Sequence, residues 1–203
     1  MDQERTAFQP LGLTTLGAEI GFARPSFQTP NPVKVTAPAL EVMTDLHQVP
    51  AATVSGRVDI ETTSQKMIAR SVRLLLVVDD DDHVIGLITA RDISGDRPME
   101  IMANLGIPFD QVKVSHVMTP ADHIEVMTME DVMSAKVGDI IMTLKHSWRQ
   151  HAVVVETDQN TGRQVIRGIF SASQIARQLG IAPQFHELSQ AFAEIDRAIN
   201  IKS

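Results

Sequence analysis

The feature that most constrains the fold is an internal repeat that begins after residue 38. Three sequence words return once, in the same order: "EVMTD" as "HVMTP" (41–45 and 116–120), "LLVVD" as "AVVVE" (75–79 and 152–156), and "GLITARDI" as "GIFSASQI" (86–93 and 168–175). The spacing between the copies grows only where loops are expected, such as the polar stretch "TDQNTGRQ". The sequence therefore predicts one structural unit that is used twice, with insertions.

Each copy predicts the element order β-α-β-β-α. A short apolar strand ("ATVS" or "HIEVM") precedes an amphipathic helix, and two strands joined by a polar turn and then a final helix follow. The helices carry apolar residues that we expect on one face: Ile60, Met67, Ile68 and Val72 in the first copy, and Val137, Ile140, Ile141 and Leu144 in the second. Gly86 and Gly168 stand inside strand-like runs, which indicates that another group approaches the backbone closely there.

This element order and these words resemble the CBS domain family. The residues that carry the resemblance are "VMT" before each copy, the apolar-Val-Val-acidic strand, and Gly-x-Ile-Thr-x-x-Asp at 86–92. The resemblance covers roughly residues 38–180 and implies an α/β (α+β) fold. Two tandem β-α-β-β-α units, residues 39–105 and 106–182, are expected to pack as a pseudo-symmetric pair, the arrangement known as a Bateman module.

The two ends of the chain fall outside the repeat. Residues 1–38 are rich in proline and glycine and predict an extended N-terminal arm, or alternatively a disordered tail. Residues 183–203 predict an amphipathic C-terminal helix with a heptad-like apolar seam, made of Phe185, Leu188, Phe192, Ile195 and Ile199. This helix could pack on its own chain or contribute to a homodimer, and the resemblance also implies a homodimer.

The motif Thr89-x-x-Asp92 has two interpretations. It fits a capping box, in which the two side chains satisfy backbone N–H groups at a helix start, and Ser171 with Gln174 fits the same pattern in the second copy. The resemblance implies more for the first copy, because Thr89 and Asp92 match the positions that contact the ribose of an adenosine nucleotide in the family. We therefore expect ligand binding by Thr89 and Asp92 as well as capping.

The second motif departs from the family pattern at its last position. Gln174 is neutral, so it cannot accept the charge-assisted hydrogen bonds that a carboxylate offers to ribose hydroxyls. The helix cap is expected to survive this change. We therefore predict one principal site in the first unit and a degenerate second site at Ser171 and Gln174.

The rest of the ligand site is less specified by the sequence. The resemblance places adenine near the first strand and its following loop, at Val54, Ser55, Gly56 and Val58, although these residues also suit ordinary core and loop. The candidates for phosphate contacts are the cations in or near the motif and the central strands: Arg73, Arg91, Arg97, Arg149 and His151. Each of these could equally be a solvated surface charge.

Composition excludes several classes of function. The net charge is −7 and no block of five or more Lys and Arg occurs, which argues against nucleic-acid binding. No apolar run approaches membrane length, and the chain has no cysteine, so we expect a cytoplasmic protein without membrane segments, disulfides or thiolate sites. No hydrolase or NTPase signature is present, so we do not expect an enzyme. "DDDDH" at 79–83 could hold a hard cation, but it is better explained as a turn, and no metal site is predicted.

These features and the resemblance together predict a regulatory module. Its expected ligand is AMP, ADP, ATP or an S-adenosyl compound, with or without magnesium, bound mainly at the first unit. Occupancy would shift a conformational or oligomeric equilibrium and so act on a protein effector that the sequence does not identify. The alternative is a module that has lost its ligand and serves in structure, dimerisation or docking.

Overall fold

The structure is a computed structural model that describes residues 32–180. These residues fall within one compact unit. Most of the predicted N-terminal arm (residues 1–31) and the whole predicted C-terminal helix (183–203) lie outside the described residues. Within the described part, no helix is both long enough and apolar enough to cross a membrane.

The described chain forms two four-stranded sheets, which confirms the predicted α/β fold. The first sheet has the order β2-β3-β4-β5, and the second has the order β1-β8-β7-β6. The strands of the first sheet are β2 (Thr53–Ser55), β3 (Leu74–Val78), β4 (Val84–Thr89) and β5 (Thr119–Pro120). Those of the second are β1 (Thr44–Asp45), β6 (Val126–Thr128), β7 (His151–Thr157) and β8 (Gln164–Ser171).

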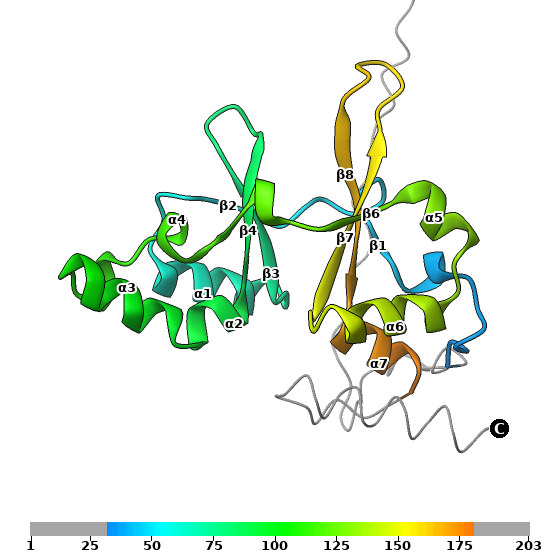
Figure 1. The fold of residues 1–203 in the computed structure, drawn as a ribbon, viewed down its shortest axis with the longest axis horizontal. Coiled ribbons are helices and arrows are strands. Elements are labelled where there is room, and N and C mark those ends of the chain that lie inside the picture. The colour runs from blue at the N-terminus through cyan, green and yellow to red at the C-terminus, as the bar shows by residue number, and fades with distance from the viewer. Residues whose placement is uncertain (1–31, 181–203) are drawn as a thin grey trace, which may run out of the picture. The chain divides into compact units, whose positions relative to one another are not determined.

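Pairing within the sheets follows the repeat. β2 pairs in parallel with β3, as β6 does with β7, while β3–β4 and β7–β8 are antiparallel hairpins. The helices are α1 (Ile60–Ala69), α2 (Ala90–Ser94), α3 (Arg97–Leu105) and α4 (Val114–Val117) in the first repeat, and α5 (Met129–Ser134), α6 (Val137–His146) and α7 (Ala172–Gln178) in the second. Short 3-10 turns occur at Ala39–Val42, Phe109–Gln111 and Ala121–His123. In each repeat the hairpin and its helices lie side by side (Figure 1).

The two long repeat helices test the predicted apolar faces. All four apolar residues that we expected on α6 are buried. On α1 the expectation is wrong for Ile68, which is 76% exposed, because Ile60, Thr63 and Met67 form the buried face at spacings of three and four residues. The buried hydroxyl of Thr63 donates to the carbonyl of Asp59 at 2.7 Å, so this polar residue is satisfied inside the core.

The segment that precedes each repeat joins the sheet of the other repeat. β1 pairs with β8, and β5 pairs with β4. The close approach predicted at both glycines is confirmed: a Cβ on Gly86 would lie 2.6 Å from the carbonyl oxygen of Thr119, and one on Gly168 would collide with the side chain of Met43. Each "VMT" segment therefore pairs with the sheet of the other repeat and packs against the glycine of that sheet.

The described end of the predicted arm extends this exchange. The N–H of Val33 donates to the carbonyl of Gln178 at 2.8 Å, and that of Gly138 donates to the carbonyl of Val35 at 2.9 Å. Val33, Val35 and Ala37 pack against the core of the second repeat. Residues 33–37 are therefore part of the folded second repeat.

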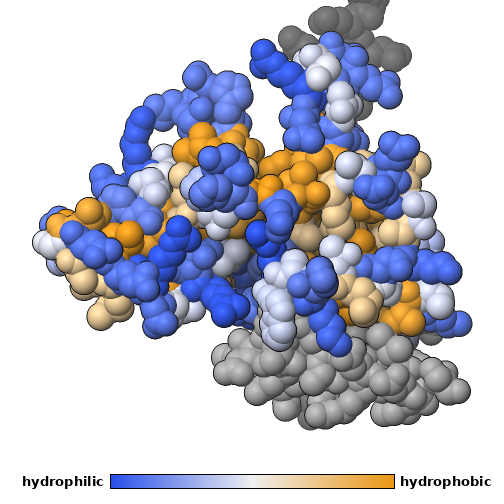
Figure 2. Space-filling model, in the orientation of Figure 1, coloured by the Kyte–Doolittle hydropathy of each residue, from blue (hydrophilic) through white to orange (hydrophobic). Residues whose placement is uncertain are grey.

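The two sheets also contact each other directly. One apolar cluster combines Leu74, Leu76 and Leu87 of the first sheet with Val153 and Val155 of the second. The central strands, β3 of the first sheet and β7 of the second, are thus buried on both faces, as their continuous apolar runs indicate. The outer surface drawn in Figure 2 is mostly hydrophilic, with separate apolar patches.

Candidate functional site

A cavity of about 160 Å³ is lined by residues from both repeats. Its lining consists of Leu74, Leu87, Thr89, Arg91, Asp92, Thr119, Trp148, Arg149, Gln150 and His151. It thus brings together five of the residues that the sequence singled out: Thr89, Arg91, Asp92, Arg149 and His151. A wider depression of about 800 Å³ is lined by other residues, among them Arg57, Asp59 and Lys113, and by none of the predicted site residues.

Thr89 and Asp92 stand where β4 runs into α2, and they form the predicted capping box. The N–H and the hydroxyl of Thr89 each donate to Oδ2 of Asp92 at 2.7 Å, and the N–H of Asp92 donates to Oγ1 of Thr89 at 3.3 Å. Capping therefore uses a single oxygen of the carboxylate. Among the described residues, the hydrogen bonds of this carboxylate all end on Oδ2, so Oδ1 remains available to a ligand.

The cavity combines cations with a half-buried, neutral imidazole. Arg91 lies on α2, and Arg149 forms an ion pair of 3.1 Å with Glu125 at an exposed position. Burial, and to a smaller extent the charge of Arg73, lower the pKa of His151 to about 4. His151 is therefore neutral near pH 7. Arg73 thus affects the pKa of His151 without lining the cavity. Arg97 begins α3 and does not line the cavity either.

The four residues predicted to hold adenine are not brought to this cavity. Ser55 lies opposite Val78 at one end of β3, whereas Leu74 at the other end of β3 lines the cavity. Val54 is buried in the core of the first repeat together with partly buried Val58, and the carbonyl of Gly56 accepts the N–H of Ser115 at 2.9 Å. The interpretation of these residues as ordinary core and loop describes their place in the structure.

Sequence reasoning missed several residues of the lining. These are Leu74, Leu87, Thr119, Trp148 and Gln150. One signal was available: the "VMT" word contains Thr119, and the prediction of close approach at Gly86 implied that some segment would pack there. The sequence did not say which segment, because the exchange of the two words between repeats is a long-range property of the fold.

The second motif does not form the expected cap. Ser171 precedes α7 without a side-chain capping bond, and its hydroxyl is instead 3.0 Å from that of Ser173. Oε1 of Gln174 accepts the hydroxyl of Thr44 at 3.3 Å. The prediction that the cap survives is therefore wrong, because the longer amide side chain bonds across to the "VMT" word and does not fold back onto its own helix start.

An ion network fixes the exchanged strand on the second sheet. Arg167 of β8 pairs with the carboxylate of Asp45 and lies 3.1 Å from that of Glu156, which also contacts His47 at 3.1 Å. Burial raises the pKa of Asp45, but the N–H of His47 and the side chain of Arg167 outweigh that effect and hold it below its usual value. The network therefore ties β1 to β8 and β7.

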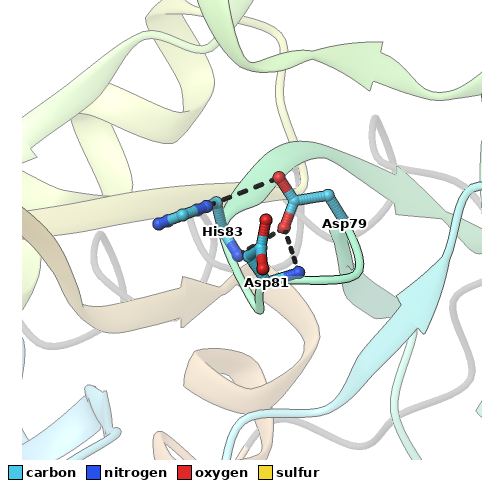
Figure 3. Close-up of side chains that lie close together, drawn as sticks. All are labelled: Asp79, Asp81 and His83. Carbon is cyan, nitrogen blue, oxygen red and sulfur yellow. Dashed lines mark hydrogen bonds and ion pairs between the residues drawn. The ribbon is translucent and has the colours of Figure 1, made fainter.

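The acidic stretch at 79–83 forms a turn, as the sequence favoured. Oδ1 of Asp79 accepts the N–H groups of Asp81 and His83 at 3.0 and 2.8 Å, and Nδ1 of His83 is 3.5 Å from Oδ2 (Figure 3). The hydrogen bond from His83 is the main cause that lowers the pKa of Asp79. Ligand atoms of Asp79, Asp81 and His83 lie within 4.8 Å of one another, but the bonds within the turn account for this closeness.

Comparison with known proteins supports the same family. The family model of the CBS domain matches residues 39–95. This match identifies a CBS domain at residues 39–95. The second repeat has the same strand order and pairing as this CBS domain, with an additional short helix, α5, before α6. No curated protein matches the sequence.

One solved structure with a TM-score above 0.5 shares the fold, and two others are similar at lower scores. An uncharacterised conserved protein from Pyrococcus horikoshii is 21% identical, and the match covers 71% of this chain and 93% of that one, with a TM-score of 0.51. A CBS-domain-containing protein from Agrobacterium tumefaciens is 21% identical over 66% and 88% of the two chains, with a TM-score of 0.48. CBSX2 in complex with AMP is 19% identical over 70% and 94%, also with a TM-score of 0.48.

Proposed function

We propose that this CBS pair is a regulatory module that binds an adenosine-containing ligand in the cavity around Thr89 and Asp92. The ligand classes are AMP, ADP, ATP and S-adenosyl compounds. The observation that carries the proposal is the carboxylate of Asp92, which lines a cavity and keeps Oδ1 outside the capping box. An ionised carboxylate oxygen in this position is a strong acceptor for ribose hydroxyls.

The remaining lining suits the other parts of such a ligand. Leu74 and Leu87 supply apolar contacts for a base, in place of the residues near β2 that the sequence suggested. Arg91 and Arg149, with Arg73 beside His151, provide positive charge for phosphate groups in a chain whose net charge is −7.

The size of the cavity suggests how binding is coupled to shape. At about 160 Å³, it is smaller than the roughly 300–1,000 Å³ of typical ligand sites. A whole nucleotide therefore has to widen it. Because Thr89 and His151 come from different repeats, widening shifts the population toward a different arrangement of the two. This shift would act on a partner protein or on a homodimer of the chain.

A structural module without a ligand is the alternative. The specific observation in its favour is that Asp92 already has a complete role as a helix cap. Under this alternative, replacing Asp92 changes stability alone, and no adenosine compound raises the melting temperature.

The experiment compares two Thr-x-x-Asp caps of the same chain. Thr128 and Asp131 cap α5 with bonds of 2.7 and 3.1 Å, but they do not line the cavity. Calorimetry with AMP, ATP and S-adenosylmethionine is expected to detect binding to the unmodified protein. Asp92→Asn should weaken it about 10-fold, because a charged acceptor becomes neutral. Asp131→Asn should leave it unchanged.

Two outcomes would contradict the proposal. One is the absence of both binding and a rise in melting temperature with every one of these ligands, since a ligand that binds only the native state must stabilise it. The other is equal weakening by Asp92→Asn and Asp131→Asn, which would assign the effect to helix stability.

A further inference from the structure

The turn that follows α6 places a tryptophan in an unusual backbone conformation. Trp148 has a φ of 54°. Its N–H donates to the carbonyl of Lys145 at 3.2 Å, and the N–H of Arg149 donates to that of Leu144 at 3.1 Å. These two bonds are those of a Schellman motif, whose left-handed position usually holds glycine. A bulky side chain there strains the backbone, so its presence calls for a reason outside the turn.

The first repeat contains the same turn with a small residue. Ser71, which follows α1, has a φ of 53°, and the N–H groups of Ser71 and Val72 donate to Ile68 and Met67 at 3.0 Å each. The turn therefore forms without an aromatic side chain. The geometry of the fold alone does not explain Trp148.

Burial in the core does not explain Trp148 either. Its exposed fraction is 74%, although it is the only tryptophan of the sequence and a large apolar residue. Large aromatic side chains usually contribute to stability by being buried. Trp148, at this exposure, contributes little in this way.

The position of Trp148 supplies the reason. It lines the same cavity as Thr89 and Asp92, together with the residues that follow it, Arg149, Gln150 and His151. The carbonyl of Gln150 in this loop accepts the N–H of Ala172 at 2.9 Å, which anchors the loop to the start of α7. An exposed indole is thus held at the edge of a cavity that already offers a ribose acceptor.

We propose that Trp148 is the platform on which the flat base of the ligand stacks, and that it sets the preference of the site for ligands that carry a base. This inference rests on the proposed function. Stacking on an aromatic ring needs only a π-face, so Trp148 distinguishes nucleotides from sugar phosphates, while Asp92 holds the ribose. Ligand binding covers the exposed indole and offsets the backbone strain of the unliganded turn.

The test replaces Trp148 with serine, the residue that occupies the equivalent turn of the first repeat as Ser71. Calorimetry with AMP and with ribose 5-phosphate is carried out on the unmodified protein, Trp148→Ser and Trp148→Phe. We expect Trp148→Ser to weaken AMP binding about 10- to 100-fold and Trp148→Phe to weaken it only a few-fold, since stacking is lost in the first variant and kept in the second. Ribose 5-phosphate should bind the unmodified protein and Trp148→Ser equally weakly.

The fluorescence of the single tryptophan gives an independent measurement. Saturating AMP should shift or quench the emission, because it covers an indole that is exposed without it. This measurement needs no variant. Trp148→Gly should melt at a higher temperature than the unmodified protein and still bind AMP more weakly, because glycine relieves the left-handed turn.

The outcomes separate this inference from the function on which it rests. If the unmodified protein binds AMP but Trp148→Ser binds it equally well, or if the emission does not respond to AMP, the role of Trp148 is overturned and the proposed function stands. If the unmodified protein binds no adenosine compound, both are overturned.

Discussion

The two repeats place the same motif at the same point of the fold and use it differently. In the first repeat, Asp92 bonds back to Thr89 within its own motif through one carboxylate oxygen, and it also lines a cavity. In the second, Gln174 bonds to Thr44 and Ser171 to Ser173, so the polar groups satisfy one another. A shared backbone therefore does not preserve a site, because the change from a carboxylate to a longer amide redirects the hydrogen bonds.

A second contrast concerns the start of the central strand. His151 in the second repeat corresponds to Leu74 in the first, and both line the cavity. The pKa of His151 is lowered to about 4 from 6.5, so between these values the unfolded chain binds a proton that the native protein does not. The free energy of unfolding is therefore expected to fall as pH drops from 6.5 to 4, by at most about 3 kcal/mol, and to be unaffected above 6.5.

His151→Leu, which copies the first repeat, removes this dependence. The measurement is urea unfolding at several pH values for both proteins, and the difference between them isolates His151 from the carboxylates that titrate at lower pH. Parallel curves for the two proteins between pH 6.5 and 4 would show that His151 titrates normally. The charged or polar groups around it, Arg73, Arg91, Asp92 and Arg149, stay unchanged in the variant.

The glycines of the two "VMT" contacts should differ in their tolerance of a methyl group. A Cβ on Gly86 meets the backbone of Thr119, whereas one on Gly168 meets the flexible side chain of Met43. We expect Gly86→Ala to lower the free energy of unfolding by about 3 kcal/mol and Gly168→Ala by about 1 kcal/mol. Met43→Ala should rescue part of the second effect, and equal losses in urea unfolding would contradict this reading of the contacts.

The ion network distinguishes the second repeat from the first. Arg167 is 14% exposed and pairs with Asp45 and Glu156, while its counterpart in the first repeat is the apolar Ile85. Arg167→Met should cost about 2 kcal/mol, because it leaves two carboxylates without their partner. The matched control is Arg57→Met, whose ion pair with Asp80 is 77% and 70% exposed and should matter by less than about 0.5 kcal/mol.

The smallest predicted difference is between the two helix starts. Thr89→Ala removes the capping bonds of α2 and should lower the free energy of unfolding by about 1 kcal/mol. Ser171→Ala removes no capping bond from α7 and should change it by only about 0.3 kcal/mol or less. A larger loss for Ser171→Ala in thermal unfolding would indicate a capping role that the structure lacks.

Local patterns predicted most of the fold and half of the site. The face of α6, the close approach at both glycines and the Thr89–Asp92 cap follow from spacing and residue type, which act over a few residues. The prediction that Ile68 is buried failed because Thr63, a polar residue with a local backbone partner, takes the buried position.

The rest depends on contacts that short patterns do not encode. Trp148 reaches the cavity only because the loop before β7 meets the end of β4, and Gln174 bonds to a residue 130 positions away. The residues near the first strand that the resemblance assigned to adenine do not line this cavity, for the same reason. Long-range packing decides which ends of the strands meet.

The exchanged "VMT" segments set a limit on how this protein can be divided. If the chain is cut between residues 105 and 112, the N-terminal fragment carries β1, which pairs with β8 of the other fragment. The same fragment lacks β5, which completes its own sheet. The N-terminal and C-terminal fragments expressed together contain all the strands of both sheets. The cut chain is then a heterodimer whose halves fold only on each other, which makes the pair suited to a split reporter.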